Sequence, residues 1–98
     1  MTFEWNENKN VANQKKHEGI SFALAARVFQ DENLLILEDR TDEQERRWHA
    51  IGRVEALVIL VVVHTYREAE NGEEIIRIIS ARAAEKREIR RYFQQALD

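Results

Sequence analysis

The chain has 98 residues, and its 15 lysines and arginines against 18 aspartates and glutamates give a formal charge of −3 at pH 7. It contains no cysteine, which excludes disulfide frameworks, thiolate zinc sites and cysteine nucleophiles. With no proline, only three glycines and 44% hydrophobic residues, its composition is that of a small folded domain and not of a disordered chain. We therefore expect residues 1–98 to form one domain.

The sequence contains no candidate membrane helix. Its most apolar run, Ala56 to Val63, has eight residues, whereas a helix that crosses a bilayer needs about 20. The first residues do not form a basic stretch followed by an apolar one, so no signal peptide is expected. The expected location is the cytoplasm.

Charge is unevenly distributed along the chain. Arg77 to Tyr92 contains six cations and two anions, a local charge of +4, so the remaining residues carry −7. Between Asp31 and Glu45, seven acidic residues face a single cation, Arg40. A local basic face attracts phosphate despite the acidic total, because the field acts over a Debye length of about 8 Å. The simpler alternative is a solvated basic helix.

Two helices are expected at the start of the chain. Asn6 and Asn8 are suitable N-cap residues for a helix over Lys9 to Lys16. Gly19 then allows that helix to end. Ser21 caps a second helix, in which apolar residues from Phe22 to Phe29 recur at helical spacing.

Strands are expected next, followed by a third helix. The expected elements are a strand at Leu34 to Leu37, an acidic loop at Glu38 to Glu45, strands at Arg46 to Val54, Leu57 to Tyr66 and Glu74 to Ala81, and a helix at Ala83 to Leu97. Leu57 to Tyr66 is a continuous β-branched run, typical of a strand buried on both faces. The sequence predicts an α+β domain of order α-α-β-β-β-β-α, in which helices flank a small antiparallel four-stranded sheet.

Asn71-Gly72 is a strong signal for a β-hairpin turn. A two-residue turn there pairs Tyr66 with Arg77 and places His64, Tyr66 and Arg77 on one face of the sheet. Arg67 and Arg82 then lie on the other face. A three- or five-residue loop would shift the register by one residue and regroup the two faces.

Most catalytic motifs are absent. His17, His49 and His64 fall on three different elements, and three separated glycines cannot form a phosphate-binding loop. No metal or cofactor is therefore expected. The unusual feature is arginine within strands, at Arg67, Arg77 and Arg82. A guanidinium remains protonated and grips phosphate oxygens with a fixed fork, although cross-strand ion pairs would also explain these arginines.

Short motifs in a fixed order cover nearly the whole chain. They are Phe3-Glu4-Trp5 with Asn8-Lys9, Lys16-His17, Gly19 to Phe22, Ala25 to Phe29, Glu45-Arg46 to Gly52, His64 to Arg67, and Arg77 to Arg82. In this order and spacing the sequence resembles the BrnT family of bacterial ribonuclease toxins from type II toxin–antitoxin systems. The resemblance implies a RelE-like fold and a metal-independent endoribonuclease that inhibits translation. It also implies a BrnA-type antitoxin, which forms a hetero-oligomer with the toxin and is its only link to operator DNA.

The resemblance further implies a site on the sheet and the last helix. Its residues are Arg67, Arg77 and Arg82 on the strands and Glu88 and Tyr92 on the helix. The arginines would stabilise the charge of a pentacoordinate phosphorane, and Glu88 or His64 would accept the proton of the RNA 2′-hydroxyl. Tyr92 would donate a proton, stack on a base or simply belong to the core. Lys86, Arg87 and Arg91 are expected to bind RNA.

Two further hypotheses remain at this point. Glu85 and Ile89 stand where a threonine and an arginine are common in the family. The chain would then be a weak or inactive homologue that acts as a binding partner in a repressor complex. Separately, Trp5 and Trp48 are candidate anchors for a basic antitoxin segment, unless both pack on the domain's own core.

Overall fold

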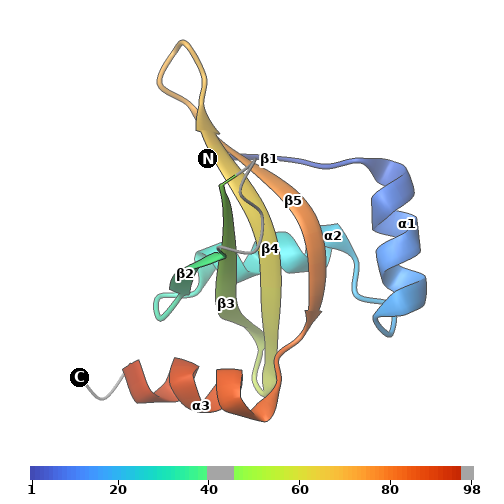
Figure 1. Cartoon of the computed structure of the whole chain (residues 1–98), viewed down its shortest axis with the longest axis vertical. Coiled ribbons are helices and arrows are strands. Elements are labelled where there is room, and N and C mark those ends of the chain that lie inside the picture. Colours follow the sequence, from blue (N-terminus) through green and yellow to red (C-terminus); the bar gives the residue numbers. More distant parts are fainter. Residues whose placement is uncertain (40–45, 96–98) are drawn as a thin grey trace.

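The structure, a computed structural model shown in Figure 1, describes residues 1–39 and 46–95. The helices are α1 (Glu7–Lys16), α2 (Phe22–Ala26), the 3-10 helix η1 (Arg27–Gln30) and α3 (Lys86–Gln95). The strands are β1 (Thr2–Glu4), β2 (Leu35–Asp39), β3 (Arg47–Glu55), β4 (Val58–Glu68) and β5 (Glu74–Ala83). Most of the predicted acidic loop, and the last two positions of the predicted helix at Ala83 to Leu97, lie outside the described residues.

The strands form one sheet of five, in the order β1-β5-β4-β3-β2. The α+β class is confirmed, but the predicted four-stranded antiparallel sheet is wrong in detail. Thr2 to Glu4 form an additional edge strand, which pairs in parallel with Ile75 to Arg77 of β5. A strand of three residues is too short to show a period of two, and only its partner reveals it.

The central strand is buried because α2 and η1 pack on one face of the sheet and α3 packs on part of the other. Figure 1 shows α2 crossing the sheet and α3 at the end away from the β4–β5 hairpin. Leu60 and Val62 of β4 pack with Phe22 and Val28 from α2 and η1 in the larger core cluster. On the other face, Ile59, Ile51 and Val61 pack around Tyr92 of α3. The expectation of a doubly buried strand is confirmed. Within the described residues, no helix is long and apolar enough to span a bilayer.

Helix α1 is held by buried polar side chains and not by an apolar stripe. Asn6 caps it, as predicted, by accepting a hydrogen bond from the backbone N–H of Lys9. Asn13 is buried, and its side chain donates to the carbonyl of Ala81 at 2.9 Å and accepts from the N–H of Ala81 at 3.1 Å. The Asn13 side chain thus continues the backbone hydrogen bonding along β5 beyond the end of β1. It pairs backbone groups at the edge of β5 that would otherwise lack a partner there.

The β4–β5 hairpin contains a bulge that changes which side chains share a face. The predicted pairs Val61–Arg82 and Val63–Ser80 are confirmed, but the register shifts between Val63 and His64. The hairpin loop is longer than predicted, since Glu68 pairs with Glu74 and the N–H of Ala69 donates to the carbonyl of Glu73.

The prediction that Tyr66 pairs with Arg77 is therefore wrong, because Arg77 lies opposite Thr65. Alternation along β4 puts Thr65 and Arg67 on one face and His64 and Tyr66 on the other. Arg77 therefore lies with Arg67 and not with His64. A longer loop and one bulge bring the three strand arginines to a common face.

Candidate functional site

Arg67, Arg77 and Arg82 all project from the face of the sheet that α3 partly covers, which we call the arginine face. Arg82 lies opposite Val61, next to the first turn of α3, and Arg77 lies opposite Thr65, toward the hairpin. Between them on this face is Ser80, opposite Val63. Same-face positions on a strand are about 7 Å apart, so the cations border a half-buried strip of sheet at Val63, Thr65 and Ser80.

Two of these arginines share one carboxylate from the edge strand. Glu4 lies 3.3 Å from Nη2 of Arg67 and 3.6 Å from Nη1 of Arg77. The two guanidinium-bearing side chains are 59% and 45% exposed. Because two cations meet a single anion in this group, it keeps a net positive charge and leaves donor groups open to solvent. Glu4 was not predicted as a site residue, since its strand was not predicted.

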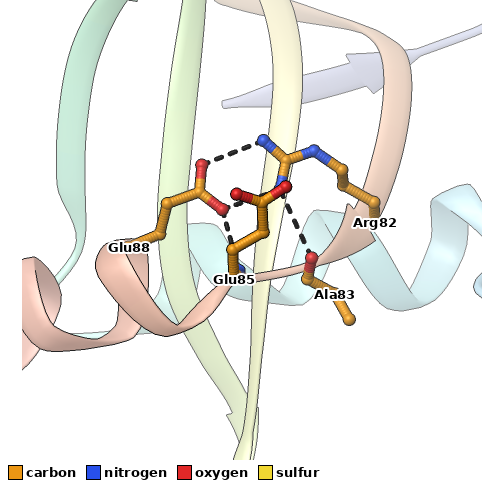
Figure 2. A network of polar contacts seen from close by, with 4 residues as sticks. All are labelled: Arg82, Ala83, Glu85 and Glu88. Carbon is orange, nitrogen blue, oxygen red and sulfur yellow. Dashed lines mark hydrogen bonds and ion pairs between the residues drawn. The ribbon is translucent and has the colours of Figure 1, made fainter.

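The third arginine is engaged differently. Nη1 and Nη2 of Arg82 donate to Oε1 and Oε2 of Glu88 at 2.7 and 2.9 Å, as Figure 2 shows. Nη1 also reaches the carbonyl of Ala83, and Oε1 of Glu88 accepts from the backbone N–H of Glu85. The hydrogen bonds from Arg82 lower the pKa of Glu88, against the opposing effect of burial. Glu88 is thus held as a carboxylate in a fixed position.

A histidine that was not assigned to the site faces it. His49 of β3 lies opposite Val63, on the arginine face, and its Nε2 is 3.1 Å from Oδ2 of Asp39. A cavity of about 330 Å³ is lined by Leu37, His49, Ile51, Arg87, Glu88 and Arg91. Alternation along β3 places His49 on the opposite face from Trp48 and Ala50. The signal that was missing was which face carried the arginines.

His64, the predicted proton acceptor, lies on the opposite face of the sheet from the arginines. It is 3% exposed, and its ring packs edge-on against Phe29 with 5.0 Å between centroids. Burial lowers the pKa of His64, which favours the neutral ring, while a contact between Nδ1 and the carbonyl of Val62 acts in the opposite direction. The structure does not bring His64 to the arginines.

Tyr92 belongs to the core, which was one of the three interpretations drawn from the sequence. Its ring is 1% exposed and packs on Ile51, Ile59 and Val61. Its hydroxyl donates to Asp31. Burial and the bond to Asp31 raise the pKa of Tyr92 to about 12. The hydroxyl is therefore bound to Asp31 and the ring is buried, so Tyr92 anchors α3 to the sheet.

The predicted RNA-binding residues Lys86, Arg87 and Arg91 are exposed on α3, and Arg87 and Arg91 border the cavity with His49. A second cavity, of about 180 Å³, lies beside Arg82 and is lined in part by Lys16, His17 and Glu85. Within residues 1–39 and 46–95, no three His, Asp or Glu side chains are grouped as metal ligands.

The sequence matches one protein family over most of its length. The model of that family, described as the ribonuclease toxin BrnT of type II toxin–antitoxin systems, matches residues 5–88. The chain belongs to the BrnT family. The resemblance found in the sequence is thereby confirmed, and with it the assignment to the ribonuclease toxins of type II systems. Such a toxin has an antitoxin as its partner.

A solved BrnT structure supports the same assignment. The chain resembles the crystal structure of the Brucella abortus ribonuclease toxin BrnT with a TM-score of 0.63 and 25% sequence identity. The match covers 88% of this chain and 99% of the Brucella toxin. No protein with a curated description is significantly similar in sequence.

Proposed function

We propose that this BrnT family member is a metal-independent endoribonuclease that cleaves RNA in the bacterial cytoplasm, inhibits translation and is neutralised by a BrnA-type antitoxin. The observation that supports the proposal best is that Arg67, Arg77, Arg82 and His49 share one face of the sheet. Glu88 of α3 is bonded to Arg82 and lines one cavity with His49. This arrangement fits phosphodiester transesterification, as in RelE-like enzymes.

Substrate binding is assigned to the cations of the arginine face and of α3. Arg67 and Arg77 share Glu4 and keep open donors, so they are suited to grip the non-bridging oxygens of the scissile phosphate. Lys86, Arg87 and Arg91 are exposed and would track neighbouring phosphates of a single strand. The half-buried strip at Val63, Thr65 and Ser80, which the strand arginines border, would contact the ribose.

The chemistry needs a base, an acid and a charge stabiliser. The 2′-oxygen attacks phosphorus as its proton passes to a base, and the bond from phosphorus to the 5′-oxygen breaks as the protonated base returns that proton, through water, to the 5′-oxygen. The products are a 2′,3′-cyclic phosphate and a 5′-hydroxyl. Arg67 and Arg77 would stabilise the additional negative charge of the phosphorane, and no metal ion is needed for that role.

His49 and Glu88 are the groups we assign to proton transfer, because both line one cavity with Arg87 and Arg91. Asp39, 3.1 Å from Nε2 of His49, holds the ring by one nitrogen and leaves Nδ1 for the substrate. Glu88, ionised and held by Arg82, is the second candidate base. Arg82 then acts mainly as a positioning residue, since both terminal nitrogens of its fork are used.

The test is cleavage of a defined single-stranded RNA by the purified chain in the presence of EDTA. We expect fragments that end in a 2′,3′-cyclic phosphate and begin with a 5′-hydroxyl. His49→Gln should lower the rate by about 10² to 10⁴, whereas the control His17→Gln should change it little. Intact RNA after incubation with the wild-type chain would instead support the alternative of an inactive homologue that serves only as a binding partner.

A further inference from the structure

A second concave site lies on the face of the sheet opposite the arginines. It is a pocket of about 310 Å³ near the hairpin end of the sheet, lined by Phe29, Leu34, Ile36, Trp48, His64 and Tyr66 among others. Helix α2 crosses the middle of this face, and the hairpin extends beyond it (Figure 1). The pocket lies where the helical layer stops short of the end of the sheet.

The rim of the pocket exposes large apolar side chains. Met1, Tyr66 and Ile36 are 59%, 49% and 42% exposed, and all three border this pocket. Trp48 is half-buried beside them and carries the guanidinium of Arg46 over its ring. Trp5, by contrast, packs edge-on against Phe22 of the core. Aromatic side chains gathered around a concavity are typical of protein interfaces.

Carboxylates lie on two sides of this apolar centre, and two of them are already paired, Glu73 with the N-terminal ammonium and Glu38 with Arg46. The hairpin carries Glu68, Glu70, Glu73 and Glu74 within seven residues. Partial desolvation, followed by the nearby charges of Glu74 and Glu68, raises the pKa of Tyr66. On the other side, Glu38 lies opposite Trp48 across β2 and β3, 3.6 Å from Arg46. An acidic rim repels RNA and favours a basic protein segment.

We propose that this pocket is the docking site of the antitoxin, and that its occupant is a basic amphipathic segment. One large apolar side chain of the segment would enter between Trp48 and Tyr66, and its lysines or arginines would face Glu68 and Glu74. The proposal rests on the antitoxin partnership of the family and adds the surface and the chemistry of the contact. Catalysis and neutralisation then use opposite faces of one sheet.

The two faces can be separated by substitution. Ile36→Lys and Tyr66→Lys place a cation at the rim, where the side chains are already exposed and folding should survive. We expect both variants to cleave RNA within twofold of the wild-type rate. We expect their Kd for the antitoxin encoded beside the toxin, measured by calorimetry, to rise by a factor of 100 or more, so that co-expression no longer prevents growth arrest.

The matched control is Val11→Lys, on α1, where the valine is 45% exposed and lies away from the pocket. It should bind the antitoxin as the wild-type chain does. Glu68→Gln with Glu74→Gln should weaken binding, and less so at high salt, because the contribution is electrostatic.

Three results would overturn the docking site. One is unchanged antitoxin affinity in both lysine variants. Another is loss of affinity in Val11→Lys as well, which would mean that the effect is not local. The third is a change of the free chain from dimer to monomer in Ile36→Lys with antitoxin binding intact, which would assign the pocket to a second copy. Failure of the nuclease proposal is read separately, from uncut RNA with the wild-type chain.

Discussion

Arg82 and Glu88 form a two-bonded ion pair, at 2.7 and 2.9 Å, that joins the end of β5 to the first turn of α3. The two side chains are 31% and 17% exposed, so the pair is only partly screened by water. The pair fixes α3, which carries Lys86, Arg87 and Arg91, relative to β5, which carries Arg77 and Arg82. Site geometry and local stability therefore depend on the same contact.

Arg82→Ala should consequently affect both cleavage and folding. The substitution leaves Glu88 partly buried without its cation, at a cost of about 1–3 kcal/mol in the free energy of unfolding. Cleavage should fall by about 10² to 10³ because Glu88 is no longer held. Arg82→Lys keeps the charge without the fork and should be intermediate in both measurements. An unchanged rate in Arg82→Ala would remove the pair from the site.

The lowered pKa of Glu88 predicts a contribution to stability that is present at neutral pH and lost at low pH. A carboxyl whose pKa is depressed on folding stabilises the protein above its unfolded pKa, near 4.5, and this contribution is lost as pH falls through the folded pKa. Glu88→Gln should therefore reduce the loss of stability below pH 4.5 in denaturant titrations. Glu85→Gln, three residues away and exposed, should retain the wild-type profile. Identical acid profiles for wild type and Glu88→Gln would contradict the assignment.

Substitution of Arg67 or Arg77 should affect cleavage but not stability. Their side chains are about half exposed and share Glu4, so replacing either with alanine should change the free energy of unfolding by no more than about 0.5 kcal/mol. Cleavage should nevertheless fall by about 10² to 10³ for Arg77→Ala. Arg90→Ala, on the exposed surface of α3, is the matched control. Equal rates for Arg77→Ala and Arg90→Ala would place the scissile phosphate elsewhere.

The sequence predicted the elements better than their pairing. The caps at Asn6 and Ser21 and the central strand were found because each has a local pattern. The edge strand at Thr2 to Glu4 and the bulge in β5 have no such pattern, since both arise from pairing with a distant segment. Pairing alone decides that Arg77 shares a face with Arg67.

For the same reason, the sequence indicated the residue types of the candidate site but not how they are grouped. Residue types suited to phosphate were visible in the strands, and the structure gathers them on one face. Which histidine is the candidate proton acceptor, His49 or His64, could not be predicted from the sequence, because the answer depends on strand register and on burial. Only the structure shows that His64 packs on Phe29 while His49 adjoins Glu88 and the cations.

The close approach of Val28 to Gly52 leaves no room for a side chain at this position. A Cβ at this position would lie 2.9 Å from Cβ and 3.0 Å from the carbonyl oxygen of Val28, where η1 crosses β3. A backbone carbonyl cannot rotate away as a flexible side chain can, so Gly52→Ala should destabilise the fold by about 1–3 kcal/mol. Calorimetry should show a fall in Tm of about 4–20 °C. Glu55→Ala, at the exposed end of the same strand, should change Tm little, and equal Tm values for the two variants would refute the close approach.

His64 predicts that the protein loses stability as the medium becomes mildly acidic. Its pKa is lowered in the folded state because burial disfavours the charged ring, so well above pH 6.5 neither state is protonated and His64 contributes no pH dependence. As pH falls below 6.5, the unfolded chain binds a proton that the folded chain excludes, and the free energy of unfolding decreases. The slope of stability against pH between 6.5 and 5 should flatten in His64→Gln, whatever that variant's absolute stability, and should persist in His17→Gln. A slope that survives in His64→Gln would mean that another group titrates in this range.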